Sequence, residues 1–227
     1  MTDRIASNVR AVRERMGKAA ERAGRDPSSV TLVAVSKKIP PAAIRQAVES
    51  GVRELGENYV QELCEKQAAL AFLADLGVSW HYIGRLQKNK AKDVVGRVAL
   101  LHGVDSSELA RIVDKHAQAH GILQDVLVQV NVAGEATKAG IPPADLPGLL
   151  ETVAPLSGIR CLGLTTIPPP ATFPEENRRH FRVLAKLAAQ HHLPHLSMGM
   201  SDDFEVAIEE GATLVRIGTA IFGPRRS

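Results

Sequence analysis

Short apolar runs alternate with longer amphipathic stretches over most of the sequence. The apolar runs are rich in Val, Ile and Leu and recur eight times, and apolar residues at helical spacing fill most of the gaps between them. The predicted strands are 31–37, 53–56, 80–84, 98–104, 125–132, 162–167, 195–199 and 214–218. The second of these, "RELG", has the weakest strand pattern.

Residues 1–24 predict a helix that packs against the rest of the fold. Its apolar stripe consists of Ile5, Val9, Val12, Met16 and Ala20, which share one helical face. The segment is charged throughout and lacks the apolar centre of a signal peptide, so we expect it to be retained in a cytoplasmic protein.

The regular alternation of strand and helix predicts parallel strands joined by right-handed crossovers. Eight repeats within 227 residues favour a closed (β/α)₈ TIM barrel over an open doubly wound sheet. We therefore expect an α/β fold with one domain spanning residues 1–227 and an extra N-terminal helix. The Pro-rich stretch 167–176 follows the sixth strand and predicts a loop at the barrel's mouth.

Composition and charge exclude several classes of protein. The chain is 44% hydrophobic and 23% charged, and no apolar run is long enough to cross a bilayer. Its formal charge of +3 comes without long Lys/Arg runs, so a phosphorylated small molecule is a better match than nucleic acid. Cys64 and Cys161 suit neither a disulfide framework nor a zinc site, and we expect no metal.

Small and polar residues follow the last two predicted strands, as "MGMSDD" and "RIGTAIFG". In a parallel barrel a phosphate commonly binds between these two loops. Gly199 and Gly218 permit close approach of the backbone, and Ser201 and Thr219 offer hydroxyl groups. The alternative is that Ser201 merely caps a helix over 202–211.

Two adjacent lysines follow the first predicted strand. If Val33 and Val35 point inward, strand alternation also turns Lys37 inward and leaves Lys38 in the loop. A lysine in a barrel mouth opposite a phosphate site suits Schiff-base chemistry on a phosphorylated aldehyde. Lys37 is therefore the candidate, and the alternative is a solvated surface lysine.

Five stretches, in this order and spacing, resemble the pyridoxal phosphate homeostasis protein family, whose members are relatives of the barrel domain of alanine racemase. They are "AVSK" (34–37), "GENYVQE" (56–62), "WHYIGRLQKNK" (80–90), "GLTTIP" (163–168) and "LSMGMSDDFEVAIEEGATLVRIGTAIFG" (196–223). The likeness spans nearly the whole chain.

The resemblance implies a barrel of the alanine racemase N-terminal type that holds pyridoxal 5'-phosphate (PLP) as a Schiff base on Lys37. It also implies that Arg216 faces the pyridine nitrogen, the alternative being that Arg216 pairs with a carboxylate and packs the last strand. The other implied cofactor-binding residues are Ser201, Gly218 and Thr219 at the phosphate, and Asn58, His81, Met198 and Gly199 along the pocket. Lys38 stands where a threonine is common in the family, which leaves open which amine reacts when PLP is in excess.

The resemblance also implies the function. Racemase relatives owe part of their turnover to a second domain that supplies a tyrosine base, and Tyr59 and Tyr82, the only tyrosines here, both lie in barrel motifs. We therefore expect a monomeric PLP carrier or regulator with no catalytic residue and with PLP-dependent apo-enzymes as its recipients. His81 could serve as a base near PLP or as a hydrogen-bonded structural residue. The alternative functions are a weak PLP-dependent amino-acid racemase and a Schiff-base aldolase acting on a sugar phosphate without PLP.

Overall fold

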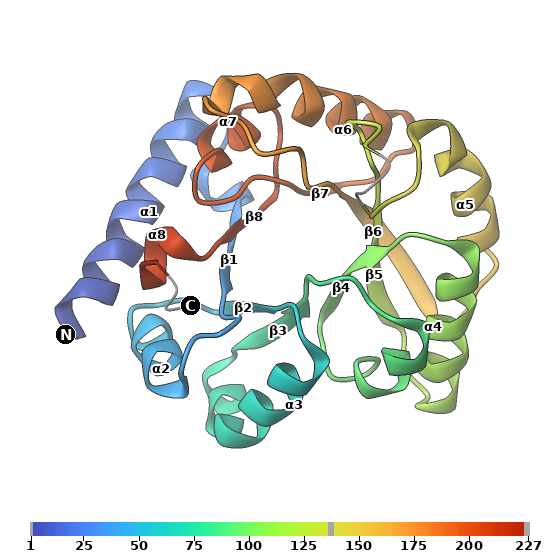
Figure 1. Cartoon of the computed structure of the whole chain (residues 1–227), viewed down its shortest axis with the longest axis horizontal. Coiled ribbons are helices and arrows are strands. Elements are labelled where there is room, and N and C mark those ends of the chain that lie inside the picture. The colour runs from blue at the N-terminus through green and yellow to red at the C-terminus, as the bar shows by residue number, and fades with distance from the viewer. Residues whose placement is uncertain (1, 136–138, 225–227) are drawn as a thin grey trace.

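Eight parallel strands close into a barrel in the order β1 to β8, and β8 pairs with β1 (Figure 1). The structure is a computed structural model that describes residues 2–135 and 139–224. The strands are β1 (Thr31–Val35), β2 (Glu54–Glu57), β3 (Ser79–Tyr82), β4 (Leu100–Val104), β5 (Gln124–Gln129), β6 (Ile159–Thr165), β7 (His195–Ser197) and β8 (Leu214–Ile217). The predicted TIM barrel is confirmed, including its weakest strand.

Helices surround the barrel on the outside (Figure 1). The α-helices are α1 (Thr2–Arg22), α2 (Pro41–Glu49), α3 (Val60–Ala69), α4 (Ser107–Ala119), α5 (Leu146–Val153), α6 (Arg178–Gln190), α7 (Phe204–Glu209) and α8 (Thr219–Phe222). The 3₁₀ segments are η1 (Pro27–Ser29), η2 (Ala71–Leu76), η3 (Lys88–Asp93), η4 (Pro143–Asp145) and η5 (Pro174–Asn177). Among the described helices, none has the length and apolar character needed to cross a membrane.

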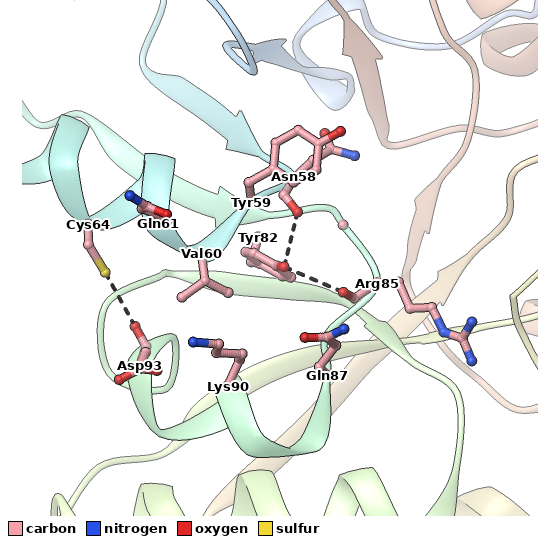
Figure 2. Close-up of a pocket in the computed structure, with 11 residues that line it drawn as sticks. Asn58, Tyr59, Val60, Gln61, Cys64, Tyr82, Arg85, Gln87, Lys90 and Asp93 are labelled. Carbon is pink, nitrogen blue, oxygen red and sulfur yellow. Dashed lines mark hydrogen bonds between the residues drawn. The ribbon is translucent and has the colours of Figure 1, made fainter.

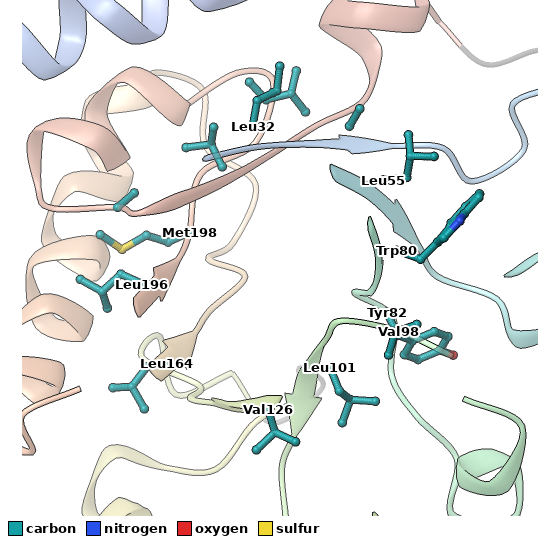
Figure 3. Close-up of a cluster of buried hydrophobic side chains, with 14 of the residues drawn as sticks. Leu32, Leu55, Trp80, Tyr82, Val98, Leu101, Val126, Leu164, Leu196 and Met198 are labelled. Atoms are coloured by element: carbon teal, nitrogen blue, oxygen red, sulfur yellow. The ribbon is translucent and has the colours of Figure 1, made fainter. Parts of the chain in front are cut away.

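Strand alternation divides the core into two layers. Side chains that point outward from the strands pack against the helices, and those labelled in Figure 3 include Leu55, Leu101 and Leu164. A smaller cluster fills the inside of the barrel and consists of Val33, Leu100, Leu127 and Leu214. Because Val33 belongs to the inner cluster while Leu32 and Ala34 belong to the outer one, β1 has the predicted phase.

The N-terminal helix α1 covers the side of the barrel where the chain also ends. The predicted stripe is confirmed, since Val9, Val12, Met16 and Ala20 are buried. Figure 1 shows α1 beside α7 and α8, and Asn8 Nδ2 donates to the carbonyl oxygen of Ile221 in α8 at 2.8 Å. The helix therefore braces the elements that follow β7 and β8.

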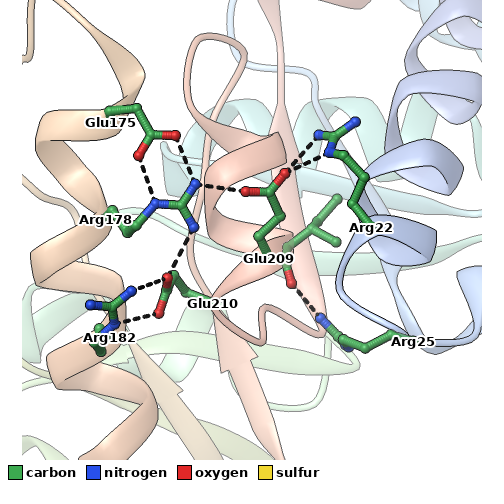
Figure 4. Close-up of polar contacts among 8 residues, drawn as sticks. Arg22, Arg25, Glu175, Arg178, Arg182, Glu209 and Glu210 are labelled. Carbon is green, nitrogen blue, oxygen red and sulfur yellow. Dashed lines mark hydrogen bonds and ion pairs between the residues drawn. The ribbon is translucent and has the colours of Figure 1, made fainter.

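Ion pairs on the outer surface tie α1, α6 and α7 together (Figure 4). Arg178 of α6 donates to Glu209 at 2.6 Å and to Glu210 at 3.0 Å, and Arg22 of α1 lies 2.7 Å from Glu209. Hydrogen bonds from Arg178 hold the pKa of Glu209 below its usual range, against the opposing effect of burial. These contacts fix α7 and, with it, the loop that precedes α7.

Candidate functional site

The two lysines that follow β1 differ in exposure and in backbone conformation. Ser36 N donates to the carbonyl oxygen of Gly56 at 2.9 Å, so the β1–β2 pairing continues one residue past β1. Lys37 comes next, lies in the turn that follows β1 and is partly buried. Lys38 is exposed, has a left-handed φ of 59°, and donates its backbone N–H to the carboxylate of Glu62 at 2.7 Å.

A buried charge cluster on the helix side holds the backbone just before these lysines. Lys66 Nζ of α3 donates to Glu57 Oε1 and to the Ser36 carbonyl oxygen, both at 2.6 Å, and to Glu62 Oε2 at 2.7 Å. Ser36 Oγ donates to Glu57 Oε1 at 2.8 Å. Burial raises the pKa of Glu57, although Lys66 opposes the rise. The cluster anchors the strand end that carries Lys37.

Asn58 follows β2 at the mouth of the barrel. Its Oδ1 is buried and accepts no hydrogen bond from any described residue. Its carbonyl oxygen accepts from Tyr82 Oη at 3.0 Å, and burial, followed by the charge of Glu57, raises the pKa of Tyr82 to about 12. A Cβ at Gly84 would lie 2.2 Å from that carbonyl oxygen, so the loops after β2 and β3 meet closely because residue 84 is glycine.

A cavity of about 750 Å³ lies beside Asn58, between α3 and η3 (Figure 2). Its lining includes Val60 and Gln61 of α3 and Lys90 and Asp93 of η3. Of the nine predicted cofactor-binding residues, Asn58 alone appears in this lining. The cavity is therefore a neighbour of the predicted pocket rather than the pocket itself.

The loops that follow β7 and β8 touch each other through Ser201. Ser201 Oγ accepts a hydrogen bond from Ala220 N of α8 at 3.3 Å. The helix α7 begins only at Phe204, with Asp203 in the N-cap position, so Ser201 does not cap it. The capping-only interpretation of Ser201 is thus wrong, because its hydroxyl points to the other loop.

Glycines shape both of these loops. Gly199 is buried with φ +90°, and a Cβ there would lie 2.6 Å from Ala207 Cβ and 2.9 Å from Phe204 Cα. Gly218 is buried and directly precedes α8, whose first residue, Thr219, is exposed. The structure therefore brings Gly199, Ser201, Gly218 and Thr219 to one end of the barrel, at the carboxyl ends of β7 and β8.

Arg216 of β8 is buried inside the barrel and pairs in register with Val33 of β1. Its Nη1 donates to Ser197 Oγ at 2.6 Å, to the Ser197 carbonyl oxygen at 2.7 Å and to Thr165 Oγ1 at 3.1 Å, and its Nη2 donates to the Thr166 carbonyl oxygen at 2.8 Å. No carboxylate of the described residues forms an ion pair with it. Burial lowers the pKa of Arg216 to about 10, which leaves it charged at neutral pH.

Two predicted pocket residues lie elsewhere. His81 faces the opening at the end of the barrel where the strands begin, which we call the lower opening. Thr31, Glu54 and Leu214, the first residues of their strands, line the same opening. The pocket prediction for His81 is therefore wrong: parallel strands begin at one end of a barrel and deliver ligand-binding residues at the other. The Met198 side chain belongs to the outer hydrophobic cluster (Figure 3), so only its backbone lies next to Gly199.

Sequence reasoning missed Lys66, His102 and Ser197. Glu62 and Lys66 have the spacing of an exposed helical ion pair, which hid the burial of Lys66. His102 lies inside the apolar run of the fourth predicted strand. A polar residue on the inward face of such a strand could have indicated a polar interaction inside the barrel. Among residues 2–135 and 139–224, no three His, Cys, Asp or Glu side chains come together in a way that could hold a metal ion.

Comparison with known proteins gives the relationships of this chain. The family described as "Alanine racemase, N-terminal domain" matches residues 2–226. The pyridoxal phosphate homeostasis protein of Aquifex aeolicus is 49% identical, over 95% of this chain and 96% of the relative, and that of Pseudomonas aeruginosa is 46% identical, over 97% and 96%.

Solved structures show the same fold. PipY of Synechococcus elongatus PCC7942, solved with PLP bound, superposes with a TM-score of 0.83 at 38% identity and covers 96% of this chain and 100% of its own. Alanine racemase of Corynebacterium glutamicum superposes with a TM-score of 0.72 at 16% identity, over 100% of this chain and 62% of its own, which shows a shared fold alone. The chain therefore belongs to the pyridoxal phosphate homeostasis proteins, within the family defined by the N-terminal domain of alanine racemase.

Proposed function

We propose that the protein binds PLP as a Schiff base on Lys37 and serves intracellular PLP homeostasis as a carrier or regulator without substantial turnover. One observation carries the proposal. Arg216 of β8 pairs in register with Val33, which faces the inside of the barrel from β1, and Lys37 follows Val33 by four residues in the turn after β1. A lysine amine thus lies further toward the mouth than a buried guanidinium, as a cofactor with an aldehyde on one side and a ring nitrogen on the other requires.

The neighbouring groups fit PLP in charge and in hydrogen bonding. The loops that contain Gly199 and Gly218, with the hydroxyls of Ser201 and Thr219, supply the kind of backbone and hydroxyl donors that bind phosphate. The buried, unpaired Oδ1 of Asn58 is an acceptor available to a ligand. The PLP bound to PipY and the names of the relatives support the same assignment.

The chain's own residues also support a low turnover. When bound, PLP supplies an electron-withdrawing ring, which acts most strongly when its nitrogen is protonated. A guanidinium only donates hydrogen bonds, so Arg216 favours an unprotonated ring nitrogen. Tyr82, with its raised pKa and its hydroxyl bound to a backbone carbonyl, does not act as a base at neutral pH. We therefore assign Lys37 and Arg216 to cofactor binding and no residue to catalysis.

The test is the absorbance spectrum of the protein mixed with PLP, followed by borohydride reduction and peptide mapping. We expect a visible band and a label on Lys37, both lost in Lys37→Ala and both retained in the matched control Lys38→Ala. A label on Lys38 or Lys88 would contradict the site. Activity on a sugar phosphate with no visible band would favour the aldolase.

A second measurement separates the carrier from the racemase. Enzymes typically turn over at about 1 to 1,000 per second. Racemisation of alanine or serine in that range, lost in Lys37→Ala, would overturn the carrier proposal. The transfer of PLP to apo-enzymes, the monomeric state and the cytoplasmic location remain predictions. So does the absence of nucleic-acid binding.

A further inference from the structure

A chain of hydrogen bonds crosses the inside of the barrel from its lower opening to Arg216. Glu54 Oε2 lies 2.9 Å from His81 Nε2, and His81 Nδ1 lies 2.8 Å from His102 Nε2. His102 Nδ1 lies 2.9 Å from Ser197 Oγ, which accepts from Arg216 Nη1 at 2.6 Å. The chain therefore joins four strands, β2, β3, β4 and β7, to the arginine of β8.

When both imidazoles are neutral, the carboxylate end fixes the direction of every bond in this chain. A guanidinium can only donate and a carboxylate can only accept. Ser197 then donates to His102 Nδ1, His102 donates through Nε2–H to His81 Nδ1, and His81 donates through Nε2–H to Glu54. In this state both imidazoles carry the proton on Nε2, and each donor points from Arg216 toward Glu54.

The surroundings of the two histidines are unequal. His102 is fully inside the fold, and burial, with the charges of His81 and Arg216, lowers its pKa well below the usual range. The lower end is more open: the Glu54 side chain is 27% exposed, and Asp125 and His195 line the same opening. Solvent therefore reaches the chain at Glu54, the partner of the buried His81 ring, whereas His102 stays neutral.

We propose that His81, His102 and Ser197 are positioning residues that set the hydrogen bonding of Arg216 according to the protonation of the lower opening. This inference rests on the proposed function, in which Arg216 faces the ring nitrogen of PLP. The proton that matters is held at the opposite end of the barrel from the cofactor. The spectrum of the cofactor should consequently respond to a group that does not touch it.

Protonation of His81 reverses the donor and acceptor roles along the hydrogen-bond chain without moving any heavy atom far. A proton added to His81 places N–H groups on both of its ring nitrogens, so His102 Nε2 must become an acceptor. The single proton of His102 then resides on Nδ1 and donates to Ser197 Oγ. Ser197 Oγ now accepts from both His102 and Arg216, and its own hydrogen has to turn to another acceptor. The bond between Ser197 and Arg216 is weakened as a result.

The first test needs no cofactor. In protein labelled with ¹⁵N in His and Arg, two-bond ¹H–¹⁵N spectra at pH 8 should show neutral Nε2–H forms of both His81 and His102. The guanidinium signals of Arg216 should move as the pH is lowered from 8, and the midpoint of that movement is then measured. His102→Phe should abolish that movement, and His120→Gln, which changes an exposed histidine, should leave it intact.

Glu54→Gln provides a second variant at a partly exposed position and keeps a hydrogen-bond acceptor for His81. Without the carboxylate, the added proton loses its opposite charge, so the movement of the Arg216 signals should begin at a lower pH. With PLP bound, the visible spectrum should show the same midpoint and the same responses to the variants. An Nδ1–H form of either histidine at pH 8, or an unchanged midpoint in both His102→Phe and Glu54→Gln, would overturn the proposed positioning role of this hydrogen-bond chain. A cofactor-free protein that shows the predicted Arg216 shifts but binds no PLP would instead overturn the proposed function. The coupling of Arg216 to the lower opening would then still hold.

Discussion

Lys66 Nζ lies 2.6 Å from Glu57 Oε1 in an ion pair that is almost completely buried, with 9% and 0% of the two side chains exposed. The same ammonium group binds the carbonyl oxygen of Ser36, the residue before Lys37. In the sequence, Lys66 has the spacing of a partner in an exposed helical ion pair. In the structure, its buried contacts fix the strand end that precedes the proposed PLP lysine.

The substitution Lys66→Met should lower the free energy of unfolding by about 3 to 5 kcal/mol, because it leaves the Glu57 carboxylate buried without a counter-charge. Urea denaturation at pH 7 measures the loss. The matched control is Lys18→Met, which breaks the exposed pair with Glu14 and should leave the urea midpoint nearly unchanged. Adding Glu57→Gln to Lys66→Met should recover part of the loss. Equal losses in Lys66→Met and the control would show that the buried Lys66–Glu57 pair does not stabilise the fold.

Gly199→Ala should destabilise the protein by about 1 to 3 kcal/mol and weaken PLP binding, since the new Cβ would meet α7 at a position where φ is +90°. Gly24→Ala is the control, because Gly24 has φ +66° but no neighbouring atom within 4 Å of the place that a methyl group would take. Its cost should be strain alone, about 1 kcal/mol, without a change in PLP affinity. Thermal unfolding and PLP titration together measure both effects, and identical behaviour of the two variants would argue against close packing at Gly199.

Arg216→Glu should raise the proton affinity of the PLP ring nitrogen and alter the pH dependence of the visible spectrum, since a carboxylate would replace a pure donor. Arg216→Lys keeps the charge but loses the planar donor geometry, so it should bind PLP more weakly with a smaller spectral change. Spectra recorded from acid to alkaline pH test both expectations. Wild-type affinity and spectra in both variants would show that Arg216 does not contact the ring.

Arg178→Ala should destabilise the protein by about 1 to 2 kcal/mol at pH 7. Arg178 lowers the pKa of Glu209 in the folded state, so its contribution is present above the ordinary carboxyl value of 4.5 and is lost as pH falls through the lowered pKa. The difference between variant and wild type should therefore shrink as the pH is taken from 7 to 3 in urea denaturation. Arg111→Ala, at an exposed position, is the control; a loss that is constant with pH would show that the ion pairs do not cause it.

Periodicity in the sequence is sufficient to predict the barrel and the phase of β1. Alternation distinguishes the two faces of a strand, and the inward orientation that it indicates for Lys37 stays a prediction. It does not give the height of a residue along the barrel axis, which depends on how far neighbouring strands are shifted. The sequence therefore puts His81 at the mouth, whereas its ring hydrogen-bonds to Glu54 at the opposite end of the barrel, and its backbone pairs with Gly56 in the register of β3 against β2.

Contacts between distant strands are beyond prediction from one sequence. The acceptors of Arg216 come from Thr165, Thr166 and Ser197, and only the closed barrel brings them together. Met198 differs, because the inward phase of Ser197 already implies that its neighbour points outward. Strand alternation is therefore enough to place the Met198 side chain outside the barrel.

The hydrogen bond between Asn8 and Ile221 spans 213 positions in sequence, and β1 pairs with β8 over nearly the same separation. Contacts this distant in the chain form slowly, because a long loop must close before they stabilise anything. During synthesis, the apolar face of α1 has no partner in α7 or α8 until those residues leave the ribosome. We therefore expect closure of the barrel to be a late event in folding. The proposed phosphate loops would be assembled last, so an incompletely synthesised chain would not retain the cofactor.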